Sequence, residues 1–210
     1  SVTAPDGATP GQVTGSHVFD EAGVYSIAVT VTDAKGATVS DSATTVSCTI
    51  VGTKGDDKLI GTSGDDVICG FLGDDIIQGK GGNDIIFGGR GSDRIHGGGG
   101  NDTILGGQGR DQIHGGDGDD VLSGDENVDL MWGGDGNDIM NGRGGNDRME
   151  GNDGNDVMNG QSGYDVIDGG EGDDVLNGMV GNDRLIGRQG ADQLDGGPGN
   201  DQLNGGQGKD

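Results

Sequence analysis

The sequence predicts an all-β protein built in two regions, and three observations favour that prediction. Residues 1–50 are rich in Val, Thr and Ala and contain a run that alternates apolar and polar side chains. Residues 51–210 are dominated by Gly and Asp and repeat with a period of nine residues. Aromatic residues make up only 3% of the chain, so neither region has the bulky side chains of an ordinary large core.

The charge of the chain limits both its folding and its partners. The formal net charge is −25, and 51 of the 210 residues are glycine, so charge repulsion and glycine entropy both oppose folding. We therefore expect something cationic to complete the fold. Nucleic acid is disfavoured as a partner, because its phosphates would meet a negative surface. No apolar run approaches the roughly 20 residues of a membrane helix, so we expect no membrane span.

The first region reads as β-structure. Val24–Thr32 alternates between an apolar and a polar face, which is typical of a half-buried strand. Asp33–Gly36 is predicted to be a turn, and Ala37–Ser47 a second β-prone run. A further turn at Glu21–Gly23 is expected to join His17–Phe19 to the first strand.

The stretch HVFDEAGVYSIAVTVTDAKGATVSDSATTVS resembles the C-terminal half of a PKD (polycystic-kidney-disease-type) domain. The matching pieces are the aromatic–turn–Gly–x–Tyr corner and the VTVTDAKG hairpin. The resemblance implies a partial Ig-like β-sandwich at residues 1–50, without the first half of the domain. The alternative is a generic Ig-like strand pair or a linker.

The second region divides into blocks of nine residues without insertion. The first three blocks, starting at Gly52, are GTKGDDKLI, GTSGDDVIC and GFLGDDIIQ. Seventeen full blocks run to Asn204, and an eighteenth begins with GGQGKD. We number the block positions 1 to 9. Position 1 is always Gly and position 6 always Asp, while position 4 is Gly in every block except one, which has Asn127.

This spacing predicts a parallel β-roll (β-helix) at residues 51–210. Positions 1–6 are expected to form a turn, in which glycines at positions 1 and 4 adopt backbone angles closed to other residues and allow close approach of neighbouring turns. Asn127 fits position 4 because Asn tolerates the left-handed region. Positions 7–9 are expected to form a strand with position 8 inward, and two blocks to make one coil. The core is then one aliphatic side chain per block, from Leu59 to Leu203.

Stacked coils bring the aspartates of position 6 together in one row along each edge. Such rows repel unless a cation lies among them, and Ca²⁺ suits them because it takes 6–8 oxygens from carboxylates and carbonyls. Zinc is disfavoured because His and Cys do not recur at the ligand positions, and Mg²⁺ by its strict octahedral shell. Asp and Asn at position 5 are attributed to turn propensity alone. The predicted metal ligands are Asp57, Asp66, Asp75, Asp84, Asp93, Asp102, Asp111, Asp120, Asp129, Asp138, Asp147, Asp156, Asp165, Asp174, Asp183, Asp192, Asp201 and Asp210.

The blocks match G-G-x-G-x-D-x-U-x and resemble the RTX (haemolysin-type calcium-binding) repeat family. The resemblance implies multiple Ca²⁺ ions, each between the turns of blocks i and i+2, at most sixteen in all. It also implies a secreted or cell-surface bacterial protein exported by type I secretion, disordered at low calcium and folded outside the cell. The expected function is a non-catalytic module of an adhesin or of an exported enzyme.

Two outward rows leave other interpretations open. Position 7 of the odd-numbered blocks holds four cations, among them Arg94, Arg148 and Arg184, which could bind an acidic polysaccharide in a carbohydrate-active enzyme or simply offset the acidic turns. Position 7 of the even-numbered blocks is apolar, which could reflect β-propensity or a packing surface for an adjacent domain. No nucleophile–base or acid–base arrangement is found, so we expect no enzyme activity. The two cysteines are too few for a disulfide framework.

Overall fold

The computed structural model describes residues 13–18, 24–32, 38–40 and 44–209. Within these ranges every regular element is a β-strand, and no helix is long and apolar enough to cross a membrane. The chain divides into two compact units, Ser1–Cys48 and Thr49–Asp210. The strands are β1 (Val13–Val18), β2 (Val24–Thr32), β3 (Thr38–Ser40), β4 (Thr44–Ser47), β5 (Ile50–Val51), β6 (Lys58–Ile60), β7 (Val67–Leu72), β8 (Ile76–Gly81), β9 (Ile85–Arg90), β10 (Arg94–Gly99), β11 (Thr103–Gln108), β12 (Gln112–Asp117), β13 (Val121–Glu126), β14 (Leu130–Asp135), β15 (Ile139–Gly144), β16 (Arg148–Asp153), β17 (Val157–Gly163), β18 (Val166–Glu171), β19 (Val175–Gly181), β20 (Arg184–Gln189), β21 (Gln193–Asp195) and β22 (Gln202–Gln207).

The first unit contains one antiparallel sheet in its described residues. The predicted strand Val24–Thr32 is confirmed as β2, which pairs with β1, β3 and β4. The predicted β-prone run Ala37–Ser47 contains two strands that pair with different parts of β2: β3 with residues 30–32 and β4 with residues 24–27. The turns predicted at Glu21–Gly23 and Asp33–Gly36 lie outside the described residues.

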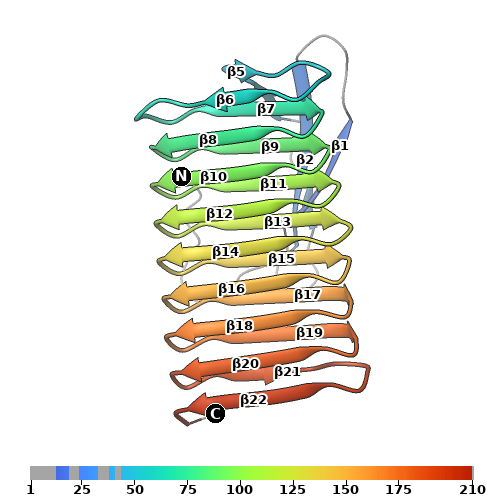
Figure 1. The fold of residues 1–210 in the computed structure, drawn as a ribbon, viewed down its shortest axis with the longest axis vertical. Helices are drawn as coiled ribbons and strands as arrows, with labels where there is room; N and C mark the ends of the chain where they lie inside the picture. The colour runs from blue at the N-terminus through green and yellow to red at the C-terminus, as the bar shows by residue number, and fades with distance from the viewer. Residues whose placement is uncertain (1–12, 19–23, 33–37, 41–43, 210) are drawn as a thin grey trace. The chain divides into compact units, whose positions relative to one another are not determined.

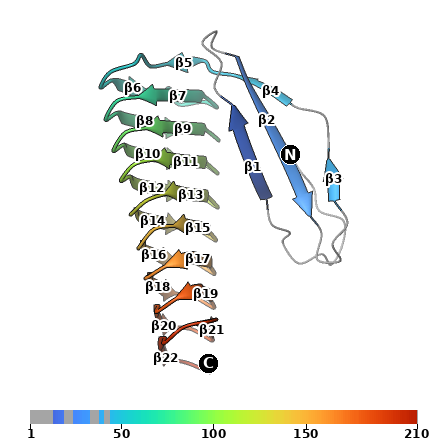
Figure 2. The ribbon, with the colours of Figure 1, turned by 90° about the vertical axis from the view of Figure 1, so that its right-hand side faces the viewer.

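The second unit is a parallel β-roll of two sheets with nine strands each (Figure 1). The even-strand sheet contains β6 to β22 and the odd-strand sheet contains β5 to β21, and both sheets follow the order of the chain. Each strand pairs in parallel with the strand eighteen residues further on, as when Ile95 lies opposite Ile113. Two blocks therefore make one coil, as predicted. Figure 2 shows the coils stacked one above another from β6 and β7 to β22.

The strands are longer than the sequence analysis predicted. We expected three residues, positions 7–9, but most strands have six and continue through positions 1–3 of the next block, as in β8 (Ile76–Gly81). Position 8 and the following position 1 are the buried positions of each strand, as shown by Ile77 and Gly79. The strands extend because the glycine at position 1 continues the alternation of inward and outward residues. The inner face therefore holds one aliphatic residue and one glycine per block.

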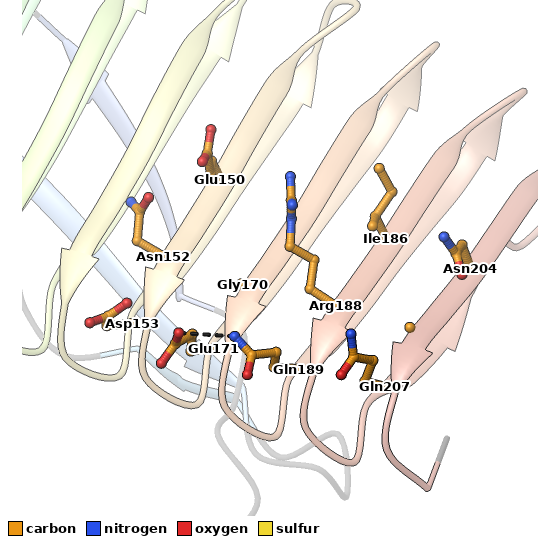
Figure 3. Close-up of a pocket in the computed structure, with 11 residues that line it drawn as sticks. Glu150, Asn152, Asp153, Gly170, Glu171, Ile186, Arg188, Gln189, Asn204 and Gln207 are labelled. Atoms are coloured by element: carbon orange, nitrogen blue, oxygen red, sulfur yellow. Dashed lines mark hydrogen bonds between the residues drawn. The ribbon is translucent and has the colours of Figure 1, made fainter.

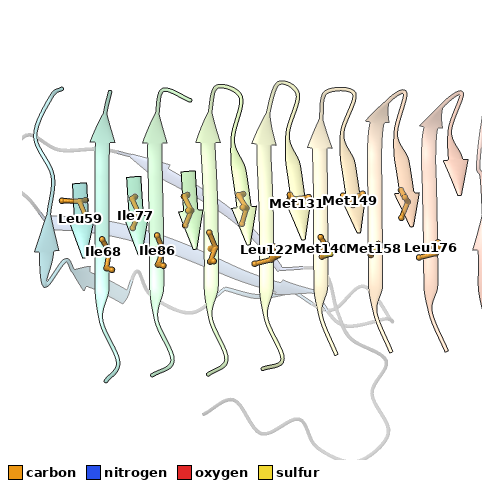
Figure 4. Packing of buried hydrophobic residues seen from close by; sticks show 14 of the residues in the cluster. Leu59, Ile68, Ile77, Ile86, Leu122, Met131, Met140, Met149, Met158 and Leu176 are labelled. Carbon is orange, nitrogen blue, oxygen red and sulfur yellow. The ribbon is translucent and has the colours of Figure 1, made fainter. Parts of the chain in front are cut away.

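The core is a single column of aliphatic side chains between the sheets (Figure 4). The position-8 residues from Leu59 to Leu185 are 0–8% exposed, which confirms their predicted inward direction. Four consecutive methionines, from Met131 to Met158, are as completely buried as the isoleucines before them. One side chain per block is a thin core, so the roll needs a further source of stability.

Candidate metal centre

Most turns of the roll contain left-handed backbone angles at two positions, 2 and 4. At position 4, Asn127 replaces the usual glycine and has a φ of 79°, so the tolerance of Asn for this region explains the exception, as predicted. Position 2 also has positive φ from block three onward, which the sequence analysis missed. Non-glycine residues adopt this angle at eight of these positions: Phe71, Lys80, Asp125, Arg143, Asn152, Gln161, Met179 and Arg188.

Position-1 glycine is required for space, and our prediction that it needs unusual backbone angles was wrong. None of the described position-1 glycines is among the residues with positive φ. A Cβ atom added to Gly97 would lie 2.2 Å from Asp102 Oδ2 and 2.7 Å from the carbonyl oxygen of Gly115. Those two oxygens occupy the space that a side chain would fill. The glycine therefore allows the aspartate of its own block to lie against the strand.

The structure brings seventeen of the eighteen predicted aspartates together in two rows, one along each edge of the roll. Those from Asp66 to Asp192 are 0–8% exposed, Asp57 and Asp201 are half-buried at the ends, and Asp210 lies outside the described residues. Within each row the backbone N–H of one aspartate donates to Oδ1 of the aspartate eighteen residues later, with N···O distances of 2.7–3.0 Å. One carboxylate oxygen of each side chain from Asp75 to Asp201 is thus satisfied by the protein.

The other carboxylate oxygen, Oδ2, is buried without a hydrogen-bond partner in thirteen aspartates, from Asp75 to Asp183. Burial raises the pKa of these carboxyl groups, and the charge of the neighbouring aspartates adds to the effect in most of them. The pKa reaches about 7 at Asp111 and about 8 at Asp129. A buried, unpaired carboxylate costs several kcal/mol, so these rows cannot be ionised without a compensating cation.

The donor set fits a hard cation such as Ca²⁺. Groups of three or more His, Cys, Asp or Glu side chains around one point do not occur in the described residues, so side chains alone do not build a site. Main-chain oxygens face the same turns: a Cβ on Gly109 would lie only 1.8 Å from the Gly91 carbonyl oxygen of the preceding coil. Carboxylate and carbonyl oxygens together are what Ca²⁺ prefers, whereas zinc prefers nitrogen and sulfur.

Position 5 holds a second ladder, which sequence reasoning assigned to turn propensity alone. The side-chain oxygen of Asn83 accepts the backbone N–H of Asn101 at 2.8 Å, and Asn101 accepts that of Asp119 at 3.1 Å. Along the edge that carries Asp65, this pattern continues to Ala191. The recurrence of Asp and Asn at position 5 was the available signal. These side chains satisfy the turn backbone and leave the position-6 carboxylates as the unsatisfied groups.

The outer face of the even-strand sheet carries the other polar candidates. Trp132 stacks on His114 with ring centroids 4.2 Å apart, and His96 meets His114 edge-on at 6.0 Å. Burial lowers the pKa of His114, and the charge of His96 adds to this effect. Figure 3 shows a polar groove beyond this row, with side chains from the strands that carry Glu150, Ile186 and Asn204. The one cation in this groove, Arg188, is paired with Asp168.

Both cysteines are disulfide-bonded, although the sequence analysis gave them no such role. Cys69 stands at position 9 of the second block and is 2% exposed. Disulfides persist mainly in oxidising compartments.

Comparison with known families gives two matches. The family model of the RTX calcium-binding nonapeptide repeat (4 copies) matches overlapping stretches at residues 49–77, 70–104, 96–131, 114–149, 150–185 and 177–210. The model of the PKD domain matches residues 3–48. No curated protein matches the chain. The first match spans most of the chain and coincides with the β-roll, and it indicates that the repeats bind calcium.

We predict that acid substitutes in part for the cation. The pKa of Asp93 is raised to about 6, that of Asp111 to about 7 and that of Asp129 to about 8, all from an ordinary value of 3.8. The folded roll therefore binds protons more tightly than the unfolded chain, so its calcium-free stability is full below pH ~4 and is lost as the pH rises through ~6–8.

Circular dichroism in the presence of a chelator measures this dependence. We expect more β-structure at pH 5 than at pH 8. Equal signals at the two pH values, or a stronger β signal at pH 8, would contradict the assignment of raised pKa values to these rows.

Proposed function

Because the chain belongs to the RTX calcium-binding nonapeptide repeat family, we propose that it is a calcium-folded, non-catalytic module whose position-6 aspartates are the metal ligands. The observation that carries the proposal is the row of Oδ2 atoms that are buried without a partner. Each ion would lie between consecutive turns of one edge and bind carboxylate oxygens together with turn carbonyls. Calcium supplies the positive charge that the rows lack.

The residues of the chain prepare these sites in three ways. Position-1 glycines leave room for the carboxylate against the strand, as at Gly97. The Oδ1 hydrogen bond between coils, as from Asp93 N–H to Asp111, fixes the orientation of each carboxylate. Left-handed residues at positions 2 and 4 shape the turn around the rows. Ligand binding to the folded state alone then drives the folding equilibrium, so the module is folded where calcium is abundant.

We further propose that the module functions outside a bacterial cell, after type I secretion in a calcium-free, unfolded form. Three features support this location. The repeats need a cation to neutralise buried carboxylates, both cysteines are disulfide-bonded, and the N-terminal unit matches a PKD domain. A PKD domain before RTX repeats suits an adhesin-like surface protein or an accessory part of an exported enzyme. In either case adjacent domains of the parent protein are the expected neighbours.

An acidic polysaccharide is the second candidate partner, as expected for an accessory module of a carbohydrate-active enzyme. The supporting observation is that Arg94, Arg148 and Arg184 are exposed on the outer face of the even-strand sheet. Arg148 lies 3.7 Å from Glu150, so part of its charge is already offset. The groove of Figure 3 is acidic apart from one paired arginine, so such a ligand would bind the arginine row and avoid the groove.

The first test of the proposed site replaces one buried ligand. Asp129→Asn keeps the shape of the side chain and removes its charge, and we expect it to raise the calcium concentration at the folding midpoint about tenfold. Asp119→Asn is the matched control, because Asp119 is an exposed position-5 side chain whose acceptor oxygen Asn retains. Calcium titration followed by circular dichroism measures both variants. The same midpoint shift in the two variants would contradict the assignment of position 6 as the ligand.

The second test concerns the arginine row. Changing Arg94, Arg148 and Arg184 together to Gln is expected to weaken binding of alginate, the probe polymer, about tenfold while leaving calcium-dependent folding unchanged. Affinity electrophoresis in gels containing alginate measures the difference. If the wild-type chain is not retarded, or if the triple variant is retarded equally, the polysaccharide proposal is wrong.

A further inference from the structure

We infer that the residue at position 2 decides whether a turn binds calcium, and that Thr53 and Thr62 convert the first coil into a calcium-free cap. The inference rests on the proposed function, because it concerns the same carboxylate rows. It adds a residue that selects among the turns, at a position where the repeat pattern otherwise places glycine or variable residues.

The first two turns satisfy their own carboxylates. Asp57 Oδ2 accepts the Thr53 N–H at 2.5 Å and the Thr53 hydroxyl at 2.9 Å. In the next turn Asp66 Oδ2 accepts the same two groups of Thr62, at 2.6 and 2.9 Å. These donors occupy the oxygen that is left unpaired in the buried turns from Asp75 to Asp183.

The threonine hydroxyl also lies close to the second class of metal ligand, the turn carbonyl. Thr53 Oγ1 is 3.4 Å from the Gly55 carbonyl oxygen, and Thr62 Oγ1 is 3.2 Å from that of Gly64. The backbone N–H of Gly55 donates to Thr53 Oγ1 at 3.2 Å, and Gly64 repeats this contact with Thr62. One neutral hydroxyl thus fills the space between the carboxylate and the carbonyl. A cation in that space would need both oxygens as ligands.

The backbone explains why threonine has this effect. Position 2 has positive φ from Phe71 to Gly206, but neither Thr53 nor Thr62 is among the residues with positive φ. A β-branched residue is strongly disfavoured in the left-handed region, whereas unbranched residues and Asn tolerate it better. In a turn with threonine at position 2, this residue therefore does not adopt positive φ. The backbone N–H of the threonine then points at the aspartate Oδ2.

The two threonines lie in the first turn of each aspartate row. Asp57 and Asp66 are the first aspartates of their rows, since the residues eighteen positions earlier are Val39 and Cys48. A carboxylate at the start of a row has an aspartate on only one side with which to share an ion, whereas an inner one has an aspartate on both sides. Donors from the protein replace the ion there, so the first coil is complete without calcium and provides a template for the next coil.

The test moves threonine into the middle of a row. Gln161→Thr places a β-branched residue where φ is 75° and where Asp165 Oδ2 has no partner. Gln161→Asn is the matched control, because Asn accepts this φ and is not branched. Native mass spectrometry of the full chain at saturating calcium counts the bound ions. We expect Gln161→Thr to bind fewer ions than the wild type, and Gln161→Asn to bind the same number.

Equal ion counts for the wild type and Gln161→Thr would overturn the inference, whereas a wild-type chain that binds no calcium would overturn the proposed function itself. Should Gln161→Thr fail to fold, Lys80→Thr and Lys80→Asn repeat the comparison next to the existing cap. At Lys80 φ is 85° and Asp84 Oδ2 lacks a partner. The loss of an ion in Lys80→Thr alone would support the inference, and equal counts in the pair would contradict it.

Discussion

The whole roll depends on one electrostatic constraint, the burial of carboxylates that the protein only half satisfies. Each inner aspartate uses its N–H and Oδ1 in a ladder between coils and leaves Oδ2 without a donor. The aliphatic column between the sheets contributes only one side chain per block, so it cannot offset the cost of charging these rows. Protons or a divalent cation must therefore bind before the coils close. This requirement makes the fold conditional on its surroundings.

The same constraint accounts for the glycine content of the chain. Close stacking of coils is what allows one carboxylate to reach the preceding coil, and it leaves no room for a Cβ at position 1. At Gly151, for example, a Cβ would lie 2.0 Å from Asp156 Oδ2. Where space allows a side chain, as at position 2, the chain tolerates Phe71 or Arg143 despite their positive φ. Position 1, in contrast, holds glycine in every block.

Much of the fold could be predicted because a strict period fixes both register and direction. The period gave the two-block coil, the buried row and the place of Asn127, all confirmed by the structure. The strand length was wrong because glycine carries no side chain whose alternation could be read from the sequence. The positive φ at position 2 could not be predicted from the sequence, because the residues at this position are chemically diverse. The contacts of Thr53 and Thr62 depend on the direction of their backbone N–H groups, which the spacing of residues in the sequence does not determine.

The central claim is that this roll closes only when a cation neutralises its aspartate rows. Far-UV circular dichroism at pH 7.5 during calcium titration, followed by chelation, tests it most directly. The account predicts little ordered β-structure in the roll without calcium, a cooperative gain as calcium is added, and loss of that gain on chelation. A full β signal in chelator that does not change when calcium is added would contradict it.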